Sequence, residues 1–366
     1  MDNKLKTLFA LLMITALGFG FIDIYFPAEN YSFERLHIFL FNLCTGGTIL
    51  LFFTQGKTKM SRSVALFFAG SLVYAFSAFL KFYPLTILVS VLLVILVEKI
   101  RIKKFSLFPS GFFRSDESVS QKFHQASLLC LSIGIAMASL VILNNEYFKL
   151  VSMRMLTLNT FFLGFSFPLS LITLSLVFAM LEKLEKTSAR KIMEVCFWTI
   201  TIGVITFFVF MLFEKMIPQI FVTAALFTAV ILVFMLYTIF AEKIQQKLFL
   251  TSGIGFLIFT AITGIAYICI MMSEGYDQED TKWLMQMHVF ASLYGWNLCG
   301  LSIICRFDDF PIKMHSLTLI GIHWLTAIIL APLGIFYPLF AVFAIIGYAF
   351  ITLTLFFSHN TAEIKK

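Results

Sequence analysis

The sequence predicts an all-α, polytopic membrane protein with twelve transmembrane helices. Of its 366 residues 60% are apolar and 13% are charged, whereas a soluble domain is about 45–50% apolar and about 25% charged. Its mean hydropathy is +0.94, and the polar and apolar alternation of an outer-membrane barrel is missing. Twelve spans of about 20 residues would use about 240 residues and leave roughly 126 for tails and loops. Residues 1–366 are therefore expected to form a single integral membrane domain with no separate soluble part.

The spans are predicted from apolar runs long enough to cross a bilayer. In order they are 5–26, 36–54, 63–80, 83–98, 126–144, 156–181, 192–213, 216–240, 248–272, 284–305, 315–335 and 337–357. The first run is expected to stay in the membrane rather than be cleaved as a signal peptide. No small-residue cleavage site precedes Pro27, and a second span follows at once.

Basic residues fall unevenly on the two sides that twelve alternating spans define. Of the 27 Lys and Arg residues, 21 lie on the side of the termini, and the other side keeps six, namely Arg35, Lys81, Lys149, Arg154, Lys215 and Lys282. Since cytoplasmic loops carry the excess of Lys and Arg, both termini are predicted to be cytoplasmic. The net charge of +7 is then an orientation signal, so the expected partner is the lipid bilayer and not nucleic acid.

Acidic and basic side chains are almost absent from the interiors of the predicted spans. Asp23, Glu98, Glu194 and Glu214 all lie within about a turn or two of a span end, where contact with headgroups explains them. Ion-coupled and proton-coupled transporters usually carry buried charges, so the sequence gives that class poor support. The six cysteines show no CxxC pair or metal-ligand spacing and are expected to be small apolar residues.

Histidine is the exception inside the spans. His37 begins the second span and His288 lies in the first turns of the tenth, so at 1.5 Å per residue both are roughly 9–12 Å outside the midplane. Two imidazoles at one depth on different helices can ligate one haem iron. The alternative is that each hydrogen-bonds a hydroxyl or carbonyl of a neighbouring helix. His315 and His323 lie in the eleventh span about 12 Å apart along its axis, so they cannot share a metal ion. Two others lie at cytoplasmic ends and are expected to be solvated: His124 and His359.

Three histidine-containing segments carry a resemblance to a known family. Segment 288–296 reads HVFASLYGW, segment 321–327 reads GIHWLTA, and segment 35–47 begins with Arg-Leu-His and ends with Gly-Gly. Together they resemble motifs of subunit I of the C-family (cbb-type) haem-copper oxidases, in the same order along a twelve-span chain. The match is strongest over about residues 284–330 and thin between 55 and 283.

The resemblance implies a haem b site without copper, in a bacterial cytoplasmic (inner) membrane. His288 matches the ligand of the family's high-spin haem, while Phe290 stands where the family has a low-spin haem ligand. His323 belongs to the third matching motif and is a further cofactor-binding candidate. Segment 158–162 reads LNTFF where the family has a copper-ligating His, and the seventh span has neither His nor Tyr. Because copper requires such imidazoles, no oxygen-reducing binuclear centre is expected, and an active oxidase is not predicted.

Three classes of function stay open on these grounds. The first is a haem-binding membrane protein with a redox or gas-ligand role, its haem b held in the outer leaflet by His288, by His37 or by both. If His288 alone binds, the iron keeps an open sixth position. The second is a cofactor-free membrane scaffold or assembly partner, and the third is a transporter of a small neutral solute.

Two other features of the outer half bear on partners and packing. The acidic loop before the tenth span would offer a docking surface for an electron donor or a cation, the alternative being a solvated loop. Other membrane subunits are also candidate partners. The aromatic side chains Tyr294, Trp296 and Trp324 are expected to serve packing in a chain with 17% aromatic residues.

Overall fold

The computed structural model describes residues 1–27, 31–56, 59–153, 155–186, 188–242, 246–273, 276–306 and 317–358. Within these residues the elements are all helices, so the predicted all-α class is confirmed. The chain divides into two compact units, Met1–Ser175 and Leu176–Lys366. Each unit is described by itself.

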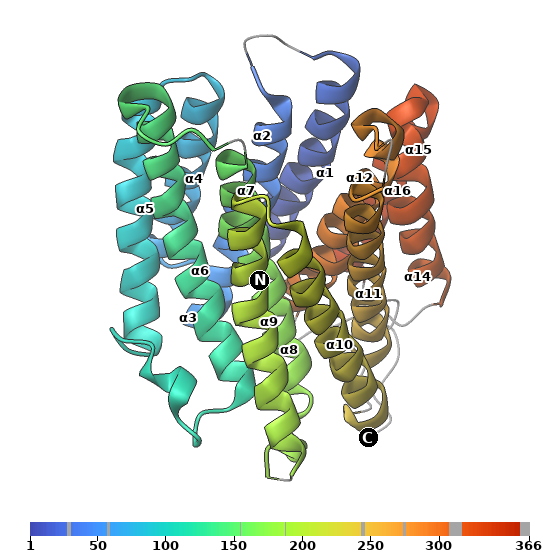
Figure 1. Cartoon of the computed structure of the whole chain (residues 1–366). Coiled ribbons are helices and arrows are strands. Elements are labelled where there is room, and N and C mark those ends of the chain that lie inside the picture. The colour runs from blue at the N-terminus through green and yellow to red at the C-terminus, as the bar shows by residue number, and fades with distance from the viewer. Residues whose placement is uncertain are drawn as a thin grey trace. The chain divides into compact units, whose positions relative to one another are not determined.

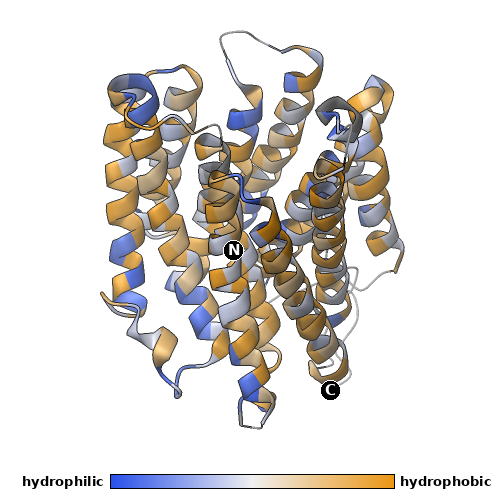
Figure 2. Cartoon of the chain, viewed as in Figure 1, coloured by the Kyte–Doolittle hydropathy of each residue, from blue (hydrophilic) through white to orange (hydrophobic). Residues whose placement is uncertain are grey.

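Ten helices in the described part of the chain are long and apolar enough to cross a membrane. They are Asn3–Tyr25, Phe33–Gln55, Arg62–Phe79, Val119–Phe148, Ala189–Leu212, Met216–Phe240, Lys247–Met271, Thr281–Cys305, Leu317–Phe336 and Pro338–Phe357. Apolar residues follow these helices along most of their length, and hydrophilic residues gather mainly near helix ends (Figure 2). The chain is therefore a helical membrane protein. The two remaining predicted spans, 83–98 and 156–181, also fall on helices.

The first unit is drawn in blue to green in Figure 1. Its elements are α1 (Asn3–Tyr25), α2 (Phe33–Ile38), η1 (Phe39–Gly47), α3 (Thr48–Gln55), α4 (Arg62–Phe79), α5 (Tyr83–Lys104), η2 (Ser110–Phe113), α6 (Val119–Ile142), η3 (Leu143–Phe148), α7 (Leu156–Phe161), η4 (Phe162–Ser166) and most of α8 (Phe167–Ala179). Side-chain oxygens of Asp2, Ser61 and Ser118 accept hydrogen bonds from the first turns of α1, α4 and α6, as N-caps do.

The second unit contains the remaining helices. They are η5 (Glu182–Lys186), α9 (Ala189–Leu212), α10 (Met216–Phe240), α11 (Gln246–Met271), α12 (Gln278–Phe290), η6 (Ala291–Asn297), α13 (Leu298–Cys305), α14 (Leu317–Trp324), η8 (Leu325–Leu330), α15 (Ala331–Phe336) and α16 (Pro338–Phe357). The buried guanidinium of Arg306 donates to the carbonyl oxygens of Phe356 at 2.8 Å and of Ser358 at 3.0 Å. It thereby satisfies backbone groups that the end of α16 leaves unpaired.

One helix in each unit is buried much more than the others and is interrupted by a π-helix. In an apolar 18-residue stretch of each helix, 89% is buried in the continuous helix α2–η1–α3 and 83% in α12–η6–α13, compared with 22% in α9. Glycines let neighbouring side chains approach the π-helical turns: a Cβ on Gly46 would lie 2.5 Å from Leu169, and one on Gly295 would lie 2.5 Å from Phe256. Helical segments of this π type are rare and are frequent at functional sites. These two helices are also the ones that carry His37 and His288.

Candidate functional site

Four of the six histidines lie in the described part of the chain, and His315 and His359 lie outside it. Among the described residues, no group of three or more His, Cys, Asp or Glu side chains is placed to hold a metal ion. A site built on the described histidines alone would take a group that needs only one or two protein ligands. Haem, held by axial imidazoles, is such a group.

Residues at the start of α2 fix the position of His37. The Ser32 side chain caps the helix by accepting from the Arg35 amide at 3.2 Å, and the Asp23 carboxylate on α1 accepts from the Glu34 amide at 3.0 Å. Both oxygens use backbone N–H groups that the first turn of a helix leaves unpaired. The first turn of α2, and His37 with it, is thus fastened to the end of α1.

His37 is directed from α2 against α1. Its ring is buried, with 7% of the residue exposed, and its Nδ1 lies 2.8 Å from the carbonyl oxygen of Ala16. A carbonyl oxygen only accepts, so Nδ1 carries the proton and the lone pair of the ring is on Nε2. A Cβ on Gly20 would lie 3.1 Å from Nδ1, so the ring rests directly on that glycine.

His288 has the same surroundings in the second unit. Its Nδ1 lies 2.8 Å from the carbonyl oxygen of Thr260 on α11, which again puts the lone pair on Nε2. A Cβ on Gly264 would lie 3.2 Å from Cε1 of the ring. The residue is half-buried, and its ring makes no second hydrogen bond to any described residue. Its Nε2 thus has a lone pair that no described residue uses.

The two histidines share one local construction. In each case the carbonyl and the glycine lie four residues apart on one face of the preceding transmembrane helix. A π-helix begins shortly after each histidine, at Phe39 and at Ala291. A metal-ligating histidine almost always donates its other ring N–H to a carbonyl or carboxylate, which fixes both its tautomer and its orientation. Both rings are held in that way.

His323 is held through its other ring nitrogen, Nε2. Its Nε2 lies 2.7 Å from the carbonyl oxygen of Tyr294, and its Nδ1 is buried with no hydrogen-bond partner among the described residues. The ring is 4.7 Å from the ring of Phe256, centroid to centroid, and is stacked on Phe249 at 6.2 Å. The nitrogen that carries the lone pair therefore lies among packed aromatic side chains of the second unit.

The prediction that His124 is solvated is wrong. Only 3% of the residue is exposed, and its Nε2 makes a 2.8 Å hydrogen bond with the Thr54 hydroxyl of α3. The ring of Phe53 stacks on it at 5.4 Å and the ring of Phe105 meets its plane edge-on at 5.5 Å. These side chains from two other segments cover the start of α6. A residue near a span end in the sequence can therefore be buried by segments that are distant in the sequence.

The acidic loop before α12 is described only in part. Asp277 is exposed, whereas Glu274 and the side chains of Glu279 and Asp280 lie outside the described residues. The docking of an electron donor there stays a prediction. Of the aromatic residues singled out in the sequence, Tyr294 and Trp296 are buried, and Trp324 stacks on Phe256 with ring centroids 4.1 Å apart.

Sequence reasoning identified both histidines but missed the two glycines and the two carbonyl oxygens that hold them. A glycine on the preceding span was the available signal, yet Gly18 and Gly20 look alike in the sequence and only Gly20 contacts the ring. No protein-family model, curated protein or solved structure matches the chain. The resemblance to oxidase subunit I therefore depends on its three motifs alone.

Proposed function

We propose that the chain is a twelve-span protein of the bacterial cytoplasmic membrane that resembles oxidase subunit I and binds haem b in the outer leaflet. Its role is redox or gas-ligand binding, without an oxygen-reducing binuclear centre. Both termini are proposed to be cytoplasmic. The location of 21 of the 27 basic residues on one side of twelve alternating spans supports this topology. Within the first unit, the C-terminal ends of α1, α4 and α6 also lie at one end, as that alternation requires (Figure 1).

The observation that carries the haem proposal is the fixed tautomer of His288. Its Nδ1–H donates to the Thr260 carbonyl, Gly264 leaves room for the ring, and Nε2 has no hydrogen bond within the described residues. The hydrogen bond from Nδ1–H to the Thr260 carbonyl also raises the basicity of the ring as a ligand. A haem b held there would supply one-electron redox chemistry and, with a single axial ligand, an open position for a diatomic gas.

His37 is the alternative axial ligand, in place of His288 or together with it, because its ring is held by the same kind of hydrogen bond and glycine contact. His323 is proposed to position η6 through its hydrogen bond to the Tyr294 carbonyl rather than to ligate iron, since its other nitrogen is enclosed. The proposed partners are the lipid bilayer together with an electron donor on the outer face or other membrane subunits.

The test is the absorption spectrum of the purified, dithionite-reduced protein from cells grown with ample haem. We expect a Soret band that is lost in His288→Ala and retained in His124→Gln, the control for loss of a buried histidine used only in packing. A shift of the band on adding carbon monoxide is expected if His288 alone ligates the iron. Absence of the shift, together with loss of the band in His37→Ala, would indicate two axial histidines.

The alternative is a cofactor-free scaffold or assembly partner with the same fold. A well-folded preparation that contains no haem after growth with ample haem would refute the haem proposal in favour of this alternative. Folding is checked independently by size-exclusion chromatography and thermal unfolding. The transporter alternative has one structural feature in its favour, a polar cavity in the first unit.

A further inference from the structure

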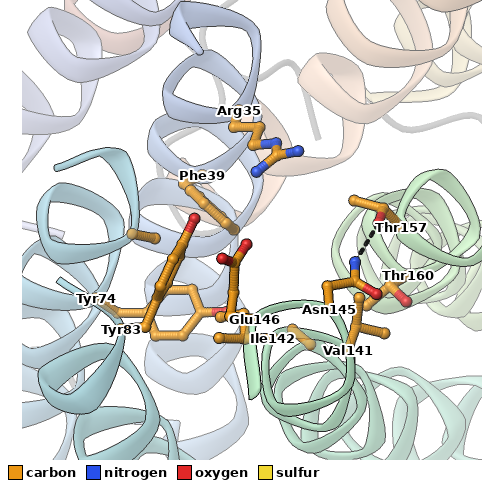
Figure 3. A pocket seen from close by; sticks show the side chains of 12 residues that line it. Arg35, Phe39, Tyr74, Tyr83, Val141, Ile142, Asn145, Glu146, Thr157 and Thr160 are labelled. Carbon is orange, nitrogen blue, oxygen red and sulfur yellow. Dashed lines mark hydrogen bonds between the residues drawn. The ribbon is translucent and has the colours of Figure 1, made fainter. Parts of the chain in front are cut away.

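The first unit contains a cavity of about 80 Å³ between α2, η1, α4, α5, α6, η3 and α7 (Figure 3). A buried water needs roughly 10–15 Å³ of such space. The cavity therefore has room for roughly five to eight waters or for one organic molecule of about that many heavy atoms. Its size excludes a large ligand such as haem.

The cavity lies on a different face of α2 from the candidate ligand His37. Arg35 and Phe39 of that helix line the cavity. They are four residues apart and share a face, whereas His37 between them points to α1. The lining residues come from the start of α2, the start of α5, the end of η3 and the start of α7. In the proposed topology all of these are outer ends, so the cavity would receive its ligand from outside.

The walls of the cavity carry one positive and one negative side chain. The guanidinium of Arg35 extends over it and has no hydrogen bond or salt bridge to a described residue (Figure 3). The carboxylate of Glu146 faces the same space and interacts with the hydroxyl of Tyr83. The two charges are not paired with one another, so each has capacity left for a ligand.

Uncharged polar groups complete the lining. Tyr74 is fully buried, and its hydroxyl has no hydrogen-bond partner among the described residues, although its ring extends toward Glu146 (Figure 3). The amide of Asn145 donates to the Thr157 hydroxyl oxygen at 3.2 Å, which leaves the Thr157 proton for another acceptor. A buried hydroxyl without a partner is costly, and a polar molecule in the cavity would remove that cost.

We propose that this cavity binds a small zwitterion, of the size of an α-amino acid with little or no side chain. Its carboxylate would accept from Arg35, whose planar fork of donors matches a carboxylate, and from the Tyr74 hydroxyl. Its ammonium group would donate to Glu146. Opposite charges on the walls favour a ligand that carries both, because an anion alone meets the Glu146 carboxylate and a cation alone meets Arg35. Apolar side chains, among them Phe39 and Ile142, line the rest of the cavity.

The experiment is equilibrium dialysis of radiolabelled glycine against the purified full-length protein. We expect saturable binding of one glycine per chain. Acetate, methylammonium and leucine, each at the same concentration, should compete at least tenfold less well, since the first two carry one charge and the third exceeds the cavity. Equal competition by acetate would overturn the proposal in favour of a simple anion site, and absence of saturable binding would overturn it altogether.

Variants identify the site. Arg35→Gln and Glu146→Gln should each weaken glycine binding about tenfold or more, as expected for hydrogen bonds to charged groups, and Tyr74→Phe about three- to tenfold. Two controls should bind as the wild type does: Arg114→Gln, which removes an exposed arginine, and Tyr348→Phe, which removes a buried hydroxyl of the other unit. Binding unchanged in both charge variants would place the glycine elsewhere and refute the assignment. Because Tyr74→Phe keeps the ring that packs on Phe39, it also tests the site without loss of the fold.

Discussion

The surroundings of His37 in the first unit and of His288 in the second repeat one arrangement with one difference. Each ring donates from Nδ1 to a carbonyl oxygen at 2.8 Å and rests on a glycine one helical turn further along. His37 is buried, whereas His288 is half-buried and has no second hydrogen bond within the described residues. The backbone holds both rings in the tautomer of a ligand, and the two residues differ in how far each is buried.

The difference indicates that orientation and accessibility of a histidine are set by separate features. Orientation comes from the preceding span, through a backbone carbonyl that accepts from the ring and a glycine that leaves room for it. Accessibility comes from the packing around the other nitrogen. A protein can therefore keep an oriented histidine after its ligand is lost. An oriented ring is a candidate ligand where its other nitrogen also has no hydrogen bond within the described residues, as in His288. Substitutions that change one feature at a time separate the two.

The largest effect is expected from Gly264→Ala. The added Cβ would lie 3.2 Å from Cε1 of His288 and would push the ring away from the Thr260 carbonyl. Loss of such an outer-shell contact typically weakens metal binding by about 10- to 100-fold. Haem titration of the apo-protein measures it. Gly321→Ala is the matched control, because a Cβ there has no neighbour within 4 Å; equal affinities in the two variants would show that the ring contact does not matter.

An effect on stability, without one on haem affinity, is expected from Gly20→Ala at the equivalent place in the first unit. The Cβ would lie 3.1 Å from Nδ1 of His37, and overpacking a buried contact costs about 1–3 kcal/mol of stability. We expect a lower melting temperature in detergent and an unchanged haem affinity. Gly18→Ala on the same helix has no neighbour within 4 Å and should melt no lower than the wild type. A loss of haem affinity in Gly20→Ala would contradict the proposed difference between the two sites and would assign iron binding to His37.

The smallest effect is expected from Thr54→Val, which removes the partner of His124. Unlike the Nε2 of His288, the Nε2 of this histidine already has a hydrogen-bond partner in the protein. The variant leaves a buried polar nitrogen unpaired and should lower the free energy of unfolding by about 1 kcal/mol or somewhat more, with no change in the haem spectrum. Thr201→Val, which removes a buried hydroxyl that has no partner within the described chain, should cost less; a larger cost there would contradict the hydrogen-bond explanation.

The helices were predictable from the sequence, but the contacts between them were not. Apolar runs located the helices because lipid requires about 20 apolar residues per span, and the scarcity of polar residues in the spans singled out His37, His288 and His323. Which glycine lies beneath which ring depends on the rotation of each helix about its axis. That rotation is altered by the π-helices η1 and η6, which no periodicity in the sequence revealed. For the same reason the sequence did not show that the side chains of Phe53, Thr54 and Phe105 bury His124.

The cavity illustrates a second limit. Its polar residues are separated by as many as 125 positions, from Arg35 to Thr160, and of these only Arg35 belongs to a motif. In the sequence, Tyr74 is an ordinary aromatic residue and Glu146 is one more residue near a span end. That both residues line one cavity becomes evident only in the structure, where five helices of the first unit meet. Sites built from single residues of several spans are thus found by structure, whereas sites built from short motifs are found by sequence.

The most direct test of the haem proposal is resonance Raman spectroscopy of the reduced protein with and without ¹⁵N-labelled histidine. With His288 as the single axial ligand, an iron–histidine stretching band is expected that shifts on labelling. The band should be absent from His288→Ala and retained in His37→Ala. A band that persists in His288→Ala, or a folded protein that takes up no haem, would contradict the assignment of His288 as the iron ligand.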